Sequence, residues 1–142
     1  MNEIFGDTSG KLDGALATNP HSFSLDKALQ ELEDIREEVE ETCAVTDDVI
    51  PIPESAYEDA RLLLQRIHPQ IPKPDMMWSE DGGIGLEWRP GDGIATMSLY
   101  GDNHVIYGAF FNKQREVEGI CSLSDTVLLQ GFVTTLRNLI PD

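Results

Sequence analysis

The stretch that decides the fold is residues 81–111, which read DGGIGLEWRPGDGIATMSLYGDNHVIYGAFF. Within it, Ile84, Leu86 and Trp88 alternate with smaller or polar residues, which is the pattern of a strand with one buried face. Glycine-rich turn sequences separate this segment from the two apolar segments that follow, and glycine tolerates the positive φ that tight hairpins need. Working outward, we expect short antiparallel strands over residues 76–79, 84–88, 94–100, 104–111 and 117–121.

Three segments outside the expected sheet have the periodicity of helices. Apolar residues recur every three or four positions in residues 24–42, 55–67 and 125–139. Each segment begins at or beside a serine, whose hydroxyl can accept a hydrogen bond from the free N–H groups of a first helical turn. We therefore expect N-caps at Ser24, Ser55 and Ser124.

The order of these elements predicts an α+β fold with two N-terminal helices, an antiparallel meander of four to five strands and a C-terminal helix packed on the sheet. We expect a flexible N-terminal tail over residues 1–22, an acidic helix and linker over 23–53, and a compact α+β domain over 54–142. Gly131 lies inside the last helix, where glycine costs about 1 kcal/mol relative to alanine. We attribute its presence to close packing against a neighbouring element.

The aromatic residues concentrate in the expected sheet, and most of them should belong to the core. Phe110 and Phe111 are adjacent on one strand, so their side chains should point to opposite faces. We expect one of the two to be exposed, or covered by the first helix or by a partner.

Charge is the most unusual bulk property of the chain. The 142 residues include 26 acids and 10 bases, which gives a net charge of −16. Residues 1–60 hold 16 acids and 3 bases (net −13), whereas residues 61–142 hold 10 acids and 7 bases (net −3). Nucleic-acid phosphates and anionic membranes both call for a basic surface. The composition therefore argues against direct binding to either and is compatible with a basic protein partner.

The acids of the first helix are the sharpest candidate for a functional surface. Three interpretations remain open: a solubilising surface, a docking face for a basic protein, and mimicry of a nucleic-acid phosphate array, to which Asp47 and Asp48 could add. For the docking interpretation, the candidate partner-binding residues are Glu33, Glu37, Glu38, Glu40 and Glu41.

The sequence contains no signature of catalysis. None of the three histidines, His21, His68 and His104, stands in a known triad motif. The glycine-rich turns join strands, whereas a phosphate loop needs its glycines to open a helix. Glu87 could pair with Asp81 or Asp92, but nothing indicates that these carboxylates converge. We therefore expect neither an enzyme nor a cofactor.

The two cysteines, Cys43 and Cys121, lie far apart in the sequence and are expected to be reduced thiols. No cluster has the ligand spacing of a zinc or calcium site. No stretch is apolar enough to span a membrane, and residues 1–20 do not have the apolar segment of a secretory signal. The expected compartment is the cytoplasm.

Residues 72–107 resemble a group of small uncharacterised bacterial proteins. The match is carried by the proline pair Pro72 and Pro74, by the turn and strand Asp81-Gly82-Gly83 and Leu86-Glu87-Trp88, and by Tyr107. Proteins of that group often accompany toxin–antitoxin or defence genes. The resemblance implies no catalytic residue, and the long acidic first helix departs from it.

These observations lead us to expect a non-enzymatic acidic protein-binding module. It would be an antitoxin-like or defence-associated factor that contacts a basic protein partner. The alternatives are a secretion-type chaperone, which would form a homodimer, and a nucleic-acid mimic that inhibits a DNA- or RNA-binding protein.

Overall fold

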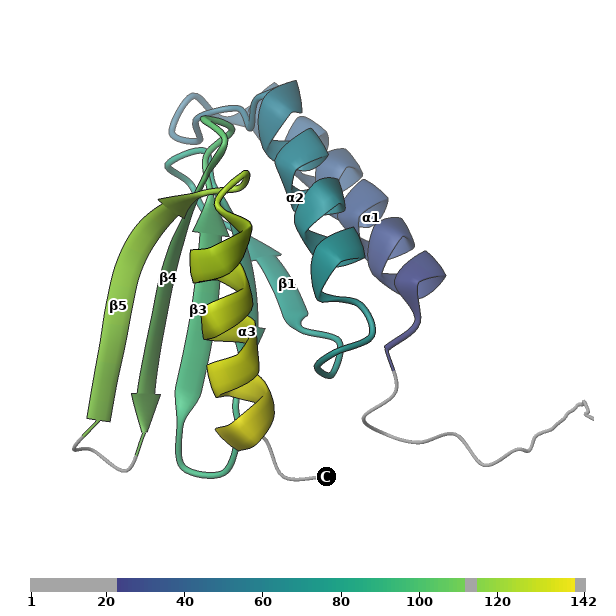
Figure 1. Cartoon of the computed structure of the whole chain (residues 1–142). Coiled ribbons are helices and arrows are strands. Elements are labelled where there is room, and N and C mark those ends of the chain that lie inside the picture. The colour runs from purple at the N-terminus through teal and green to yellow at the C-terminus, as the bar shows by residue number, and fades with distance from the viewer. Residues whose placement is uncertain (1–22, 112–114, 140–142) are drawn as a thin grey trace, which may run out of the picture.

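The computed structural model describes residues 23–111 and 115–139 and confirms the expected α+β architecture (Figure 1). The tail expected over residues 1–22 lies outside this part of the chain, as does His21. Two helices precede a five-stranded sheet and a third helix follows it. The elements are α1 (Leu25–Val45), α2 (Glu54–Ile67), β1 (Asp75–Trp78), β2 (Ile84–Trp88), β3 (Ile94–Leu99), β4 (His104–Phe111), β5 (Arg115–Ser122) and α3 (Thr126–Leu139).

The sheet is the predicted meander, with strand order β1-β2-β3-β4-β5 and antiparallel pairing throughout. Its register places Leu86 beside Met97, Met97 beside Tyr107, and Tyr107 beside Gly119. Residues paired in this way share a face of the sheet, and side chains alternate between faces along each strand. The last strand is longer than the expected residues 117–121.

The described helices gather on one face of the sheet. In Figure 1, α3 and α2 lie over this face and α1 packs beside α2. The strands contribute fully buried side chains to this side, among them Leu86, Met97 and Leu99, and the helices contribute others, such as Leu64 and Leu136. Burying these apolar side chains is the main source of stability for such a two-layer domain.

Helix α1 docks on its own chain. Its apolar stripe of Ala28, Leu32, Ile35 and Val39 is buried and belongs to the same hydrophobic cluster as α2 and the sheet. This packing supplies the stabilisation that a helix rich in acids near its C-terminus does not have by itself.

Arg36 fastens the outer side of this helix pair. Its guanidinium lies 4.2 Å from the ring centroid of Tyr57 and donates two hydrogen bonds, of 2.5 and 2.9 Å, to the carboxylate of Glu54. The bidentate geometry holds the pKa of Glu54 below its ordinary value, chiefly through the hydrogen bonds from Arg36. Glu31 links α1 to the segment before β1, since its carboxylate lies 2.8 Å from the ammonium of Lys73.

The start of α1 was predicted correctly. Ser24 is its N-cap, and its hydroxyl accepts a hydrogen bond from the backbone N–H of Lys27 at 3.3 Å. His68 fixes the chain just before this cap, because its Nε2 lies 2.9 Å from the carbonyl oxygen of Phe23 and the two rings pack edge to face.

The expected N-cap of the second helix at Ser55 is wrong. Helix α2 begins one residue earlier, with Pro53 in the N-cap position and no side-chain cap. The carbonyl of Pro53 accepts a hydrogen bond from the backbone N–H of Ala56, so Ser55 already lies within the first turn of the helix.

The expected N-cap of the last helix at Ser124 is also wrong. The Asp125 carboxylate accepts a hydrogen bond from the N–H of Leu128 at 3.1 Å and so caps α3. The hydroxyl of Ser124 instead lies 2.7 Å from that of Ser122.

Close packing does not explain Gly131. A Cβ atom built on this residue would meet no atom within 4 Å, so the expected neighbour is missing from the described part of the chain. The residue is exposed on the outer side of α3.

Candidate functional site

The five candidate carboxylates of α1 divide into two sets, and the first set is engaged by the chain itself. Glu33 lies 3.3 Å from Nε of Arg36 and 3.6 Å from a guanidinium nitrogen of Arg61. Glu38 accepts a hydrogen bond from the indole N–H of Trp78 at 3.1 Å. These two acids therefore help to fasten α1 to α2 and β1.

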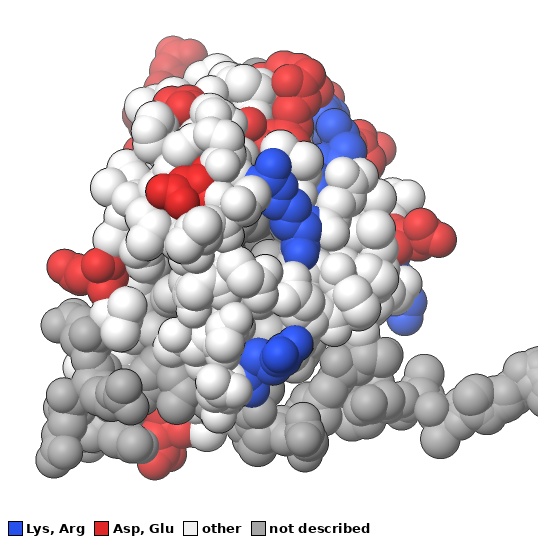
Figure 2. All heavy atoms as spheres, viewed as in Figure 1, with Lys and Arg blue, Asp and Glu red and all other residues white. Residues whose placement is uncertain are grey.

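The second set consists of Glu37, Glu40 and Glu41, which are exposed. Within residues 23–111 and 115–139, no ion pair or side-chain hydrogen bond engages them. Figure 2 shows Asp and Glu side chains gathered toward the end of the molecule where α1 ends and α2 begins, with Lys and Arg nearer the middle of this view. The outward surface of α1 thus keeps uncompensated negative charge.

A second surface is the sheet face opposite the helices, which no described helix covers. Four large apolar side chains on it are exposed: Met77 by 42%, Ile106 by 45%, Phe110 by 39% and Ile120 by 59%. The exposure of Phe110 agrees with the expectation that one of the two adjacent phenylalanines is not in the core. Monomeric proteins seldom leave a cluster of large apolar side chains on one surface without a use for it.

The centre of this open face is hollow. A row of register partners crosses it, namely Thr96 on β3, Gly108 on β4 and Glu118 on β5. These three residues line both a groove of about 550 Å³ toward Ile106 and Ile120 and a smaller hollow of about 190 Å³ toward Phe110. Because Gly108 has no side chain, it forms the floor where the two hollows meet.

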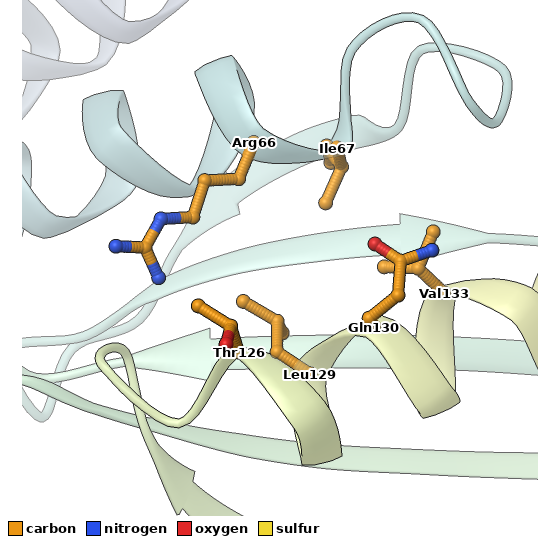
Figure 3. Close-up of a pocket in the computed structure, with 6 residues that line it drawn as sticks. All are labelled: Arg66, Ile67, Thr126, Leu129, Gln130 and Val133. Carbon is orange, nitrogen blue, oxygen red and sulfur yellow. The ribbon is translucent and has the colours of Figure 1, made fainter.

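A third concavity lies between α2 and α3 (Figure 3). It has a volume of about 250 Å³, and among the described residues that line it only Arg66 is charged. Arg66 is already used, because its guanidinium donates a hydrogen bond to the carbonyl of Leu123. Gln130 is likewise bonded across the gap to Gln70 at 2.7 Å. This pocket does not bring together the titratable groups that acid–base or nucleophilic catalysis needs.

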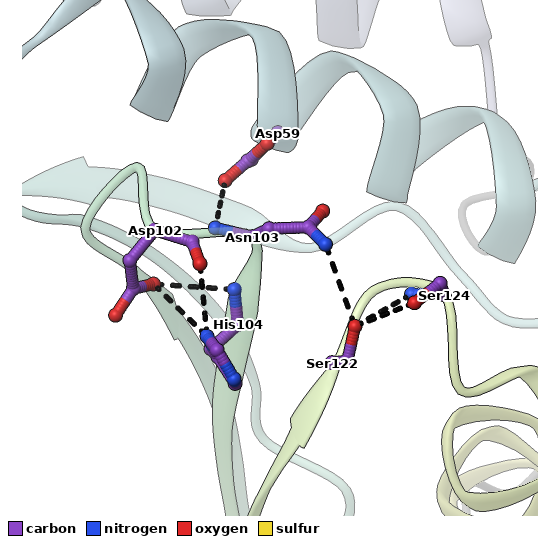
Figure 4. Close-up of polar contacts among 6 residues, drawn as sticks. All are labelled: Asp59, Asp102, Asn103, His104, Ser122 and Ser124. Atoms are coloured by element: carbon purple, nitrogen blue, oxygen red, sulfur yellow. Dashed lines mark hydrogen bonds and ion pairs between the residues drawn. The ribbon is translucent and has the colours of Figure 1, made fainter.

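A cluster of polar side chains surrounds the β3–β4 turn (Figure 4). Nδ1 of His104 lies 2.8 Å from the carbonyl oxygen of Asp102 and 3.9 Å from its carboxylate. Ser122 is the register partner of His104, but its hydroxyl is bonded to Ser124 and to the amide of Asn103. In the described chain no hydrogen bond joins Ser122 to His104, so the three residue types do not form a nucleophilic triad.

This cluster has a structural role instead. Asn103 has a φ of 66°, and its N–H donates a hydrogen bond to the carboxylate of Asp59 on α2 at 3.0 Å. The turn is thereby fixed to the helix layer.

Of the three carboxylates considered as a catalytic pair, Glu87 and Asp81 are engaged by other neighbours, and Asp92 is exposed in the β2–β3 turn. Glu87 lies 2.6 Å from Nε of Arg89. Asp81 accepts hydrogen bonds from the hydroxyls of Ser79 and Tyr100, and the first of these is the main reason that its pKa is lowered.

The described residues do not form a metal-binding site or a disulfide. No group of three or more His, Cys, Asp or Glu side chains there could hold a metal ion. Both cysteines are free thiols, as expected, and burial raises the pKa of Cys121. None of the described helices is long and apolar enough to cross a membrane.

Comparison of the chain with protein-family models, with curated proteins and with solved structures finds no match. Two surfaces of the described chain combine exposure with groups that no neighbour engages, namely the acidic face of α1 and the open face of the sheet.

Proposed function

We propose that this protein is a non-enzymatic acidic binding protein of the cytoplasm that docks a basic partner protein on α1. The observation that carries the proposal is the division of the α1 surface. The apolar stripe is buried in the chain's own core, while Glu37, Glu40 and Glu41 face solvent and form no ion pair with a cation of the described residues. The resemblance of residues 72–107 adds that the partner is a toxin or a defence factor.

Electrostatics would govern this contact mainly through its rate of formation. Exposed carboxylates that pair with Lys or Arg at the rim of an interface each add little to affinity. Together, the 16 acids and 3 bases of residues 1–60 create a field that draws a basic protein toward α1. Such attraction weakens as salt shortens the Debye length, so the complex should form more slowly at high ionic strength.

The test is a charge reversal with a matched control. One variant carries Glu37→Lys, Glu40→Lys and Glu41→Lys. The control carries Glu58→Lys, Glu80→Lys and Asp92→Lys, which changes the net charge equally at exposed acids of α2 and of two turns. Tagged forms of both variants and of the wild type are recovered from native cells at low and high salt.

We expect a salt-sensitive basic protein to accompany the wild type and the control and to be lost from the α1 variant. Circular dichroism should show that all three proteins are folded. Equal retention by both variants, or equal loss from both, would reject α1 as the docking face.

The two remaining alternatives give different results. A secretion-type chaperone would sediment as a dimer. A nucleic-acid mimic would yield a partner that DNA or RNA displaces from the complex. A monomer whose complex resists added nucleic acid excludes both.

A further inference from the structure

We infer that the open face of the sheet is a second binding surface, and that its occupant is an extended segment of a partner protein that places one Arg or Lys side chain in the hollow over Gly108. This inference concerns a surface other than α1, and it holds or fails independently of the proposed function.

The walls of the hollow follow from the strand register. Along β4, Ile106 and Phe110 lie two residues to either side of Gly108, so all three share the open face. Across the sheet, Thr96 and Glu118 flank Gly108 on the neighbouring strands. The hollow therefore has apolar walls along the strand, a hydroxyl on one side and a carboxylate on the other.

This combination suits a long cationic side chain. Arg and Lys have an apolar stem that covers hydrophobic surface and a charged head that seeks a carboxylate. The stem would lie against Ile106, the head would reach Glu118, and the ring of Phe110 would offer a cation–π contact. An uncharged side chain would leave Glu118 desolvated and unpaired, and that has a free-energy cost.

The charges of the described chain favour a foreign occupant over a second copy. Glu118 is exposed, and no described cation pairs with it, whereas the nearby Glu87 is already held by Arg89. A face-to-face dimer would bring together two chains that each carry a net charge of −16. Like charges of that size oppose association at low salt, while a basic segment is attracted.

The hollow can be filled without disturbing the fold. A Cβ built on Gly108 has its nearest neighbours at 3.8 Å (the Val117 carbonyl), 3.9 Å (the Thr96 hydroxyl) and 4.0 Å (Glu118 Cβ), which are ordinary contact distances. Valine suits a strand, so Gly108→Val should fold well while occupying the space that the partner side chain needs. Glu118→Gln removes the charge at nearly constant shape.

The probe is a capped nine-residue peptide of alternating Thr and Val with one central Arg, titrated into the full chain at low salt. Amide chemical shifts report where it binds. Matched peptides carry Gln or Glu in place of the Arg. Asp75→Asn is the control variant, because Asp75 is an exposed carboxylate on the same face, at the far edge of the sheet.

We expect shifts centred on Thr96, Gly108 and Glu118. Affinity should fall about tenfold or more in Gly108→Val and in Glu118→Gln, the scale set by one lost charge-assisted hydrogen bond of about 1.4 kcal/mol or more. Asp75→Asn and the α1 charge-reversal variant should bind as the wild type does, and the Gln and Glu peptides should bind at least tenfold more weakly.

The inference is overturned if no shifts appear at the hollow, if the Gln peptide binds equally well, or if Gly108→Val retains binding. A wild-type dimer in sedimentation that becomes a monomer in Gly108→Val would also overturn it, because the face would then belong to a second copy. Loss of the α1 complex alone leaves this surface intact, so the two failures are distinguishable.

Discussion

The two faces of the sheet are built from the same strands but are completed differently. On the covered face, side chains such as Leu86, Met97 and Val105 have no exposed surface, because this face is covered by α2 and α3, with α1 packed beside α2. On the open face, Ile106 and Ile120 remain about half exposed. The comparison teaches that the apolar residues of one set of strands can have two roles. Those on the covered face stabilise the fold, and those on the open face form a surface that another molecule can bind.

Two glycines on adjacent strands make the contrast sharper. Gly119 lies on the covered face, where Tyr107 crosses it and packs against Phe132 of α3, with ring centroids 4.7 Å apart. A Cβ on Gly119 would lie 2.6 Å from the Tyr107 hydroxyl oxygen. Gly108, on the open face, has only ordinary contacts around it. The ring of Tyr107 therefore fills the space over Gly119, whereas no side chain fills the space over Gly108.

The largest expected effect is the difference in unfolding free energy between truncating a core leucine and truncating an exposed isoleucine. Leu86→Ala should lower the free energy of unfolding by about 2–5 kcal/mol, because it leaves a cavity under the helices. Ile106→Ala should cost less than about 1.5 kcal/mol, since much of that side chain is already in water. Urea denaturation measures both, and similar losses would mean that the open face is not open in solution.

The next effect compares the two strand glycines. Gly119→Ala should destabilise the protein by about 1–3 kcal/mol, because the new methyl group must push Tyr107 away from Phe132. Gly108→Ala should change stability by no more than about 0.5 kcal/mol. The same unfolding assay tests the pair. A loss in Gly108→Ala that matches the loss in Gly119→Ala would contradict the hollow.

At a third glycine, in helix α3, the same substitution by alanine should raise stability rather than lower it. Gly131→Ala should stabilise the protein by about 1 kcal/mol, because alanine is the better helix former and nothing lies within 4 Å of the new Cβ. Thermal unfolding followed by circular dichroism should show a raised midpoint. A lowered midpoint would indicate that an unseen neighbour packs on this side of α3.

The smallest effect concerns the charges that fasten the helix layer. The pKa of Glu54 is lowered in the folded protein by its hydrogen bonds from Arg36, so the stabilisation is fully present above its ordinary pKa of 4.5. It is lost as pH falls through the lower, folded-state pKa. Glu54→Gln should therefore make stability less dependent on pH in acid. In an Arg36→Met background the same substitution should have a much smaller effect on that dependence, because only the weaker attraction of Arg61 remains, and an unchanged effect there would contradict the pairing.

The sequence allowed the order of elements, the strand alternation and the cap at Ser24 to be predicted, because each depends on neighbours within a few residues. The caps at Ser55 and Ser124 were wrong for a local reason. Residues one or two positions apart compete for the same turn, and the backbone at Pro53 and the side chain of Asp125 decide between them. Such competition is not visible in a pattern of residue types.

The candidate surfaces could be predicted only in part. The run of acids on α1 was evident, but the engagement of Glu33 and Glu38 by Arg61 and Trp78 depends on contacts between distant segments. The hollow escaped prediction because it requires the register that sets Gly108 between Thr96 and Glu118. A glycine within an otherwise bulky strand was the one available signal.

The strand order also bears on how quickly the protein can fold. Each strand pairs with the next one along the chain, so every step of sheet formation closes only a short loop and loses little chain entropy. Low contact order of this kind favours fast folding for a β-rich domain. The slower steps should be those that join distant segments, such as the seating of α1 on β1. Because no described helix packs on the open face, this face is complete as soon as β4 and β5 have paired.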